Sequence, residues 1–135
     1  MQLLAFDYGL KNIGVATGQT LTGTASPQAP LRARDGIPDW AEIETLLRDW
    51  RPERVLVGLP LNMDGTESEL SARARKFANR LHGRFGLPVE MVDERLSSFE
   101  AKGEVMARGG SRDYGKNPVD SIAARIIVET YLGSL

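Results

Sequence analysis

The chain has 135 residues, of which 41% are hydrophobic and 26% charged, and it contains no cysteine. This length predicts a single domain over residues 1–135, and the absence of cysteine excludes disulfides, zinc–thiolate sites and thiol nucleophiles. A net charge of −1 is unlike that of a strongly basic nucleic-acid binder, so any affinity for nucleic acid must come from a local patch. No apolar run approaches the roughly 20 residues of a membrane span and no leader pattern precedes the first strand, so we expect a cytoplasmic protein.

Two short apolar runs near the N-terminus, residues 3–6 and 13–17, flank a polar turn. Their length suits strands, and the short connection containing Gly9 predicts a β-hairpin. Asp7 closes the first run, where a carboxylate is expensive to bury unless something pairs with it. Two interpretations stay open for it: a turn residue that bonds its own loop, or a metal ligand held at a strand end beside Gly9, which lets a ligand come close.

The next segments predict an edge strand, a loop and a helix. Residues 22–26 are rich in threonine and poorly apolar, which favours an edge strand. Residues 27–38 contain three prolines and are predicted to form a loop. Residues 40–49 follow a helical pattern with Asp39 as the N-cap. We assign both tryptophans of the chain, which lie at or next to this helix, to the core.

A continuous apolar run over residues 55–58 predicts a strand buried on both faces. A long loop follows to residue 66, and a further strand is predicted over residues 89–92. Asn62 and Asp64 are candidates for substrate contact from this loop, although Asp64 followed by glycine also suits an ordinary turn.

Four basic residues of the long helix predicted at residues 67–84 are spaced by three or four positions and therefore share a face. They are Arg73, Lys76, Arg80 and Arg84. Such a face would position phosphates without reading bases. Four later basic residues extend the same track: Arg95, Arg108, Arg112 and Lys116. The alternative is a solvated helix face with no partner.

Three acidic positions converge in this arrangement. Strands 3–6, 55–58 and 89–92 can lie parallel and side by side, so that their carboxyl ends open on one crevice. Asp7 ends the first strand, and Asp93 with Glu94 ends the last. Beyond a helix predicted to end near residue 107, Asp120 falls in the first turn of the final helix, whose N-terminal end favours an anion. An all-carboxylate site suits Mg²⁺ or Mn²⁺, and two such ions can support phosphodiester hydrolysis.

Five long motifs support a specific resemblance. They are FDYGLKNIGVA at residues 6–16, VGLPLNMDGTES at 57–68, RARKFANRL at 73–81, DERLSSFEA at 93–101 and KNPVDSIAA at 116–124. The chain resembles the YqgF/RuvX family, whose members are called Holliday junction resolvases or pre-16S rRNA nucleases. The resemblance implies an RNase H-like (RuvC-like) nuclease domain. The element order itself predicts an α/β fold with a five-stranded mixed sheet and helices on both faces.

The resemblance also implies site residues and a task. It selects Asp7, Glu94 and Asp120 as catalytic residues and ligands of Mg²⁺ or Mn²⁺, and it alone prefers Glu94 to Asp93. It implies 5′-end maturation of pre-16S rRNA, with structured RNA and a ribosomal precursor particle as partners. We expect water as the nucleophile, because no activated serine or cysteine is visible. A monomer or weak dimer without membrane partners is expected.

The sequence is also compatible with other functions. A four-way DNA junction would be the substrate of a resolvase, which needs paired cuts and hence a symmetric dimer. A nucleic-acid or ribosome-assembly binding module would use the same surface without catalysis. ATP-dependent phosphotransfer is disfavoured, because the fold with a similar Asp-x-Gly loop needs two such domains.

Tyr8 is expected either to stack on a base or to pack on its loop, and His82, the single histidine, is expected to be structural.

Overall fold

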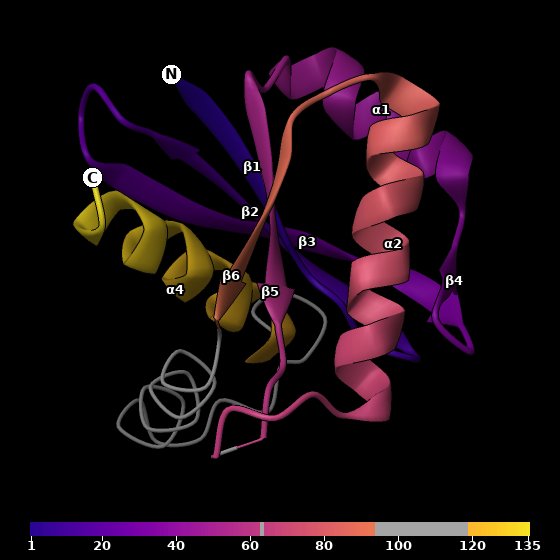
Figure 1. Cartoon of the computed structure of the whole chain (residues 1–135). Helices are drawn as coiled ribbons and strands as arrows, with labels where there is room; N and C mark the ends of the chain where they lie inside the picture. Colours follow the sequence, from indigo (N-terminus) through magenta and orange to yellow (C-terminus); the bar gives the residue numbers. More distant parts are fainter. Residues whose placement is uncertain (63, 94–118) are drawn as a thin grey trace.

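The computed structural model describes residues 1–62, 64–93 and 119–135, and side chains of the last helix from residue 121 onward (Figure 1). The elements follow the chain in this order: β1 (Gln2–Asp7), β2 (Asn12–Gln19), β3 (Thr24–Arg34), β4 (Ile37–Pro38), α1 (Trp40–Trp50), β5 (Arg54–Leu59), α2 (Glu69–Phe85), β6 (Val89–Asp93) and α4 (Val119–Gly133). The helix predicted to end near residue 107 lies outside the described residues. None of the described helices is long and apolar enough to cross a membrane.

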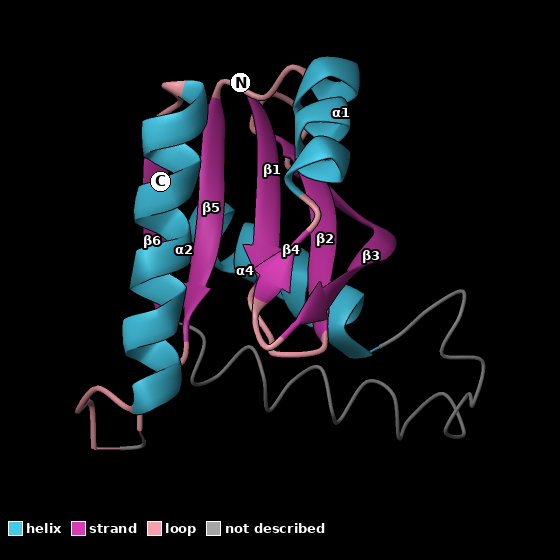
Figure 2. Cartoon of the chain, turned by 90° about the vertical axis from the view of Figure 1, so that its right-hand side faces the viewer, coloured by secondary structure: helices cyan, strands magenta, loops and turns pink. Residues whose placement is uncertain are grey.

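The strands form one sheet in the order β4-β3-β2-β1-β5-β6. The first three strands make an antiparallel meander, whereas β5 pairs parallel to β1 and β6 parallel to β5. The predicted neighbours of β1 are therefore confirmed. The carboxyl ends of β1 and β5 lie at the same edge of the sheet in Figure 2, and the parallel pairing brings the end of β6 to that edge too. We call this the carboxyl edge.

The fold class predicted from the sequence is confirmed, but the loop predicted over residues 27–38 is wrong. β3 continues to Arg34, and Ile37–Pro38 adds a sixth strand. Prolines are tolerated here because β3 pairs on its outer side only through Ala33 and Arg34, so most of that side is an edge. The pairing with β2 also shifts register between Ile13 and Val15, opposite Pro30.

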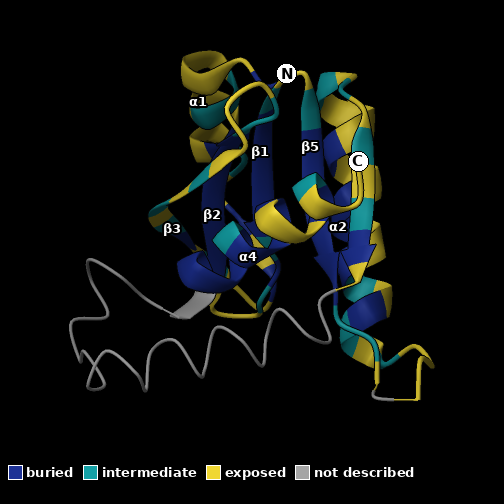
Figure 3. Cartoon of the chain, turned by 90° about the vertical axis from the view of Figure 1, so that its left-hand side faces the viewer, coloured by how far each residue is buried: buried dark blue, intermediate teal, exposed yellow. Residues whose placement is uncertain are grey.

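Two cores pack on the two faces of the sheet, as Figures 2 and 3 show with α1 and α2 on one side and α4 on the other. Successive strand residues point to opposite faces. In β1, Leu4 and Phe6 join the core under α1 and α2, whereas Leu3 and Ala5 join the core under α4. The face of any residue in the central strands can therefore be assigned by alternation.

The two long helices under the first core begin at definite caps. The Asp39 carboxylate accepts a hydrogen bond from Ala41 N at 2.9 Å, as predicted. Ser68 caps α2 in a capping box with Ser71, so that helix begins two residues later than expected. The expectation that both tryptophans belong to the core holds only in part. Trp40 packs on Phe77, but Trp50 ends its helix and is 38% exposed.

Candidate acidic site at the carboxyl edge

Asp7 is the last residue of the central strand β1 and is half-buried. Leu3 and Ala5 point toward α4, so alternation places Asp7 on the same face of the sheet. Its partner across the antiparallel pair is Gly14 of β2. The strand thus presents a carboxylate at the carboxyl edge, on the side covered by α4.

Glycines flank Asp7 on both neighbouring strands. Gly14 stands directly opposite it on β2, and on the other side Gly58 follows Val57, the β5 partner of Phe6. Directly opposed residues on one face carry their Cβ atoms about 4.5–5.5 Å apart. Because neither glycine has a side chain, no side chain of these two strand positions stands beside the Asp7 carboxylate. The sequence did not reveal this pair, since only the register brings the two glycines together.

The first turn of α4 is fixed close to the same edge. The buried hydroxyl of Ser121 donates a hydrogen bond of 2.7 Å to the carbonyl oxygen of Gln28 in β3. Gln28 pairs with Val15, and Val15 pairs with Phe6, the residue before Asp7. The backbone of Asp120 precedes Ser121 in this turn. The N-terminal end of a helix favours an anionic group, so the turn suits a carboxylate or a phosphate.

The third acidic position cannot be assigned from geometry, because Glu94 lies outside the described residues. Its neighbour Asp93 ends β6. Val92 belongs to the core under α4, so alternation places Asp93 on the other face, away from the face of Asp7. The choice of Glu94 over Asp93, which the family resemblance made, stays a prediction.

The donor chemistry available at this edge is carboxylate oxygen, which fits a hard divalent cation such as Mg²⁺ or Mn²⁺. Among the described residues, no group of three or more His, Cys, Asp or Glu side chains is placed to hold a metal ion. Two of the three predicted ligands, Glu94 and the side chain of Asp120, fall outside that set. The role of Asp7 as a metal ligand therefore stays a prediction.

A family model described as RuvX, Holliday junction resolvase, matches residues 1–134. The chain belongs to the RuvX family. A protein of Marinobacter nauticus named "Putative pre-16S rRNA nuclease" is 66% identical over 130 residues, which cover 96% of this chain and 91% of the relative. A relative of the same name from Pseudomonas putida is 60% identical over 131 residues, covering 96% and 93% of the two chains.

Solved structures show the same fold at low sequence identity. RuvC of T. thermophilus in complex with a Holliday junction substrate aligns with a TM-score of 0.60 at 18% identity, covering 99% of this chain and 96% of RuvC. The fowlpox virus resolvase bound to Holliday junction DNA aligns with a TM-score of 0.58 at 15% identity, covering 99% and 98% of the chains. This RuvX chain therefore has the RuvC-like RNase H fold.

The turn after Asp7 depends on Gly9 for its own geometry. A Cβ on Gly9 would lie 2.3 Å from the carbonyl oxygen of Asn12, so any side chain would displace the backbone of the hairpin. This requirement is structural and exists without a ligand. A role for Gly9 in ligand approach stays a prediction for the RuvX site.

Asn62 and Asp64 are exposed and organise their own turn. Asp64 Oδ1 accepts hydrogen bonds from the backbone nitrogen of Thr66 at 3.0 Å and from its hydroxyl at 2.6 Å. Asn62 Nδ2 donates to the same hydroxyl at 3.0 Å. The turn interpretation of these residues is confirmed, while their contact with substrate stays a prediction.

The basic row on α2, which consists of Arg73, Lys76, Arg80 and Arg84, lies on the face of the sheet opposite α4. Its first and last members are engaged in contacts within the protein. Arg73 forms ion pairs with Asp35 at 3.2 Å and with Glu69 at 3.6 Å, and the hydrogen bond and charge of Asp35 raise the pKa of Arg73. The guanidinium of Arg84 lies 4.4 Å from the ring centroid of Trp40. The four later residues that were predicted to extend this row, Arg95, Arg108, Arg112 and Lys116, lie outside the described residues.

Lys76 and Arg80 are the members of this row that stay available. Both are exposed, and neither forms an ion pair with another residue in the described part of the chain. With Tyr8 and Phe77 they line a cavity of about 300 Å³. Tyr8 itself is buried, donates to the carbonyl of Gly36 at 3.1 Å and packs on Phe77. Of the two interpretations of Tyr8, packing is the one that the structure shows.

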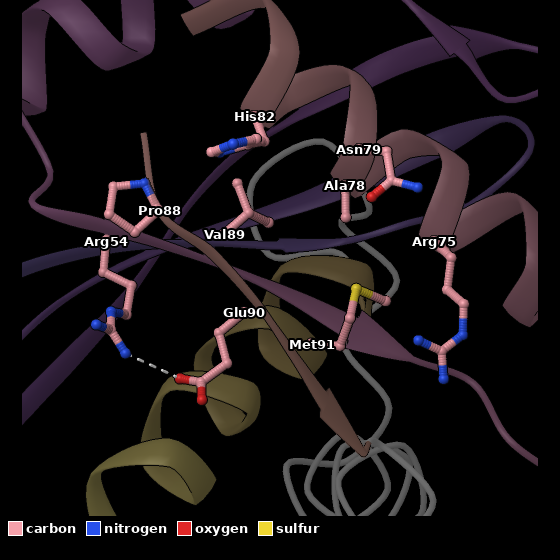
Figure 4. A pocket seen from close by; sticks show the side chains of 9 residues that line it. All are labelled: Arg54, Arg75, Ala78, Asn79, His82, Pro88, Val89, Glu90 and Met91. Carbon is pink, nitrogen blue, oxygen red and sulfur yellow. Dashed lines mark hydrogen bonds and ion pairs between the residues drawn. The ribbon is translucent and has the colours of Figure 1, made fainter. Parts of the chain in front are cut away.

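A larger hollow of about 510 Å³ lies between α2 and β6 (Figure 4). Its arginines form ion pairs within the protein, since Arg54 pairs with Glu90 at 3.4 Å and Arg75 pairs with Glu67. His82 lines it too, exposed and with Nδ1 2.8 Å from the carbonyl of Leu87. Asp7 does not border this hollow, so its size does not make it the candidate site.

Proposed function

We propose that this chain is a metal-dependent nuclease that processes the 5′ end of pre-16S rRNA. The observation that carries the proposal is Asp7, held at the carboxyl edge of the central strand between Gly14 and Gly58 and on the face where α4 begins. Close relatives over nearly the whole chain carry the corresponding name. The substrate class is structured RNA within a ribosomal precursor particle, which is met in the cytoplasm.

Asp7, Glu94 and Asp120 would hold Mg²⁺ or Mn²⁺. When bound, such ions lower the pKa of a water nucleophile and stabilise the leaving oxygen. The protein contributes position: Asp7 pairs with Gly14 of β2 and directly follows Phe6, which pairs with Val57 of β5. The hydrogen bond from Ser121 to Gln28 fixes the turn that carries Asp120.

Substrate contacts are proposed on three segments. Lys76 and Arg80 are exposed on α2 and would contact phosphates without reading bases, together with Arg73 and Arg84 at the ends of the row. Arg95 and Lys116 would extend this track. Gly9, Asn62 and Asp64 would border the substrate from loops near the site.

The decisive test is Asp7→Asn, which keeps the shape of the side chain but removes its charge. Cleavage of an rRNA fragment carrying its 5′ leader is measured in Mg²⁺ and in Mn²⁺. Because a metal ion contributes several kcal/mol to such a step and 1.4 kcal/mol is tenfold, we expect a loss of at least about 100-fold. The matched control is Asp49→Asn, an exposed carboxylate on α1, which should cleave at the wild-type rate. Unchanged cleavage by Asp7→Asn would remove Asp7 from the mechanism.

A second candidate function is resolution of four-way DNA junctions, which the fold shared with RuvC and the fowlpox resolvase favours. A resolvase makes two symmetric cuts and needs a dimer. Light scattering at assay concentration and cleavage of a synthetic junction test this candidate. A monomer that cleaves only the rRNA substrate excludes it. A non-catalytic binding module would instead bind RNA and give no cleavage in either metal.

A further inference from the structure

β3 ends at the same sheet edge as β1 and carries two arginines there, Arg32 and Arg34. β3 is antiparallel to β2, which is antiparallel to β1, so β3 and β1 point the same way. The end of β3 therefore lies at the carboxyl edge, as Figure 2 shows. Arg32 pairs with Asn12, at the start of β2. Only the short turn after Asp7 separates this pair from β1.

The two arginines point to the same face of the sheet as Asp7. Leu31 belongs to the core under α1 and α2, and Ala33 packs against it. Alternation then places Arg32 and Arg34 on the other face, the one that α4 covers. The first turn of α4 rests on this strand a few residues earlier, through the Ser121–Gln28 hydrogen bond. Asp7, the start of α4 and the two arginines thus share one face and one edge.

These arginines are not neutralised within the described part of the protein. Both are exposed, and neither forms an ion pair with any described residue, in contrast to Arg73. Lys11, also exposed and without such a pair, is tied to the same strand because its carbonyl oxygen accepts from Ala33 N at 2.8 Å. We call Lys11, Arg32 and Arg34 the β3 cation group.

Two carboxylates lie on the outer side of the β3–β4 pair. Asp39 and Glu42 line a cavity of about 600 Å³ together with Arg32 and Arg34. Asp39 is engaged in capping α1, and neither carboxylate forms an ion pair with these arginines. The charged lining of this outer cavity therefore consists of two arginines and two carboxylates.

We propose that the β3 cation group binds phosphates of the RNA strand on one flank of the acidic site, an inference that rests on the proposed nuclease function. Arg32 and Arg34 are two residues apart, so their backbones are about 6.5–7 Å apart along the strand. Each guanidinium offers a planar fork of donors that matches a phosphate. The group makes no use of base edges, so its binding is independent of sequence and sensitive to salt.

The test separates binding from cleavage. A fluorescein-labelled RNA hairpin with a single-stranded 5′ extension is titrated with full-length protein in Ca²⁺, and anisotropy gives the dissociation constant at several salt concentrations. On a single strand, each phosphate contact contributes a slope of about 0.7 in log K against log salt, or roughly fivefold in affinity at 0.1 M salt relative to 1 M. Arg32→Gln/Arg34→Gln should therefore weaken binding by up to about 25-fold and flatten the slope by about 1.4.

Two matched variants make the result specific. Arg32→Lys/Arg34→Lys keeps the charge and should recover most of the affinity. Arg48→Gln/Arg51→Gln removes the same charge at the end of α1, at the opposite edge, where Glu53 N donates to Gln2 O at 2.8 Å. This control should bind like wild type. Equal affinity and slope for wild type and Arg32→Gln/Arg34→Gln would overturn the inference, as would a wild type that does not bind the hairpin.

Failure of the two proposals is distinguishable. If Asp7→Asn loses cleavage while Arg32→Gln/Arg34→Gln binds and cleaves normally, the nuclease proposal stands. The proposal that the β3 cation group binds RNA phosphates is then refuted. If the arginine variant loses binding while wild type cleaves nothing, the group binds RNA but the nuclease proposal fails. Circular dichroism of the variants should match wild type, since the substituted side chains are exposed.

Discussion

The contact between α4 and β2 can be tested at Gly18. A Cβ built on Gly18 would lie 2.4 Å from Cγ1 of Val128 and 3.3 Å from the carbonyl oxygen of Thr24. Val128 is fully buried, and its branched side chain has few rotamers. Gly18→Ala therefore forces the helix or the side chain to move. The same substitution should change the free energy of unfolding little in a protein where Val128 has been replaced by alanine.

The magnitudes follow from packing. Overpacking a core by one methyl costs about 1–3 kcal/mol, and the rigid neighbour puts Gly18→Ala at about 2–3 kcal/mol. Val128→Ala removes two buried methyl groups at about 0.8 kcal/mol each and leaves a cavity, so about 2–3 kcal/mol is expected. If the two substitutions acted independently, the double variant would be destabilised by their sum, about 4–6 kcal/mol. In Gly18→Ala/Val128→Ala the new methyl group fills the space that Val128 has vacated, so we expect a destabilisation of only about 2–3 kcal/mol.

Urea unfolding, followed by circular dichroism and by tryptophan fluorescence, gives the free energy of unfolding of all four proteins. The coupling energy should be about 2 kcal/mol or more in favour of the double variant. Additivity of the two single effects within about 0.5 kcal/mol would refute the reasoning, because it would mean that the two positions do not compete for the same space. Equal m-values are required for the comparison to hold.

Three further predictions concern single residues. Ser121→Ala removes the buried bond to Gln28 O and should cost about 1 kcal/mol. It should also lower the cleavage rate more than RNA affinity, whereas Thr130→Ala, exposed on the same helix, should change neither; equal effects of the two would contradict this. Tyr8→Phe leaves the carbonyl of Gly36 without its donor and should lower stability by about 1 kcal/mol in urea unfolding; no change would show that water replaces the hydroxyl. His82→Ala removes an exposed ring that contacts Leu87 and should leave the rate of rRNA cleavage unchanged, so a large loss of rate would assign His82 a part in the reaction.

Much of the sheet was predictable because its central strands have simple patterns. Residues 55–58 form a continuous apolar run, and the structure buries that strand on both faces. The parallel arrangement of β1, β5 and β6 followed from such runs separated by a helical segment. Local chemistry predicted the Asp39 cap equally well. These features depend on short-range patterns that a single sequence contains.

The second part of β3, residues 27–34, was missed because its prolines carry a local signal that the sheet overrides. An edge strand tolerates residues without an N–H, and only the pairing shows which side of β3 is the edge. This error hid Arg32 and Arg34, which were assigned to a loop. The glycines around Asp7 were missed for a related reason: residues 7, 14 and 58 become neighbours only through the strand register. Glu94 could be chosen only by resemblance.

The division of the sheet into two faces has a consequence for synthesis. The meander β1–β2–β3 is built from neighbouring segments and can form early, because chains fold from the N-terminus as they emerge. The face that carries Asp7, however, is covered by α4, the last described element of the chain. Until that helix has been made, Leu3, Ala5 and Ala16 have no cover and Asp120 is absent from the edge. Translation of α4 therefore completes the candidate site, and a chain released before α4 is made lacks the cover of the face that carries Asp7.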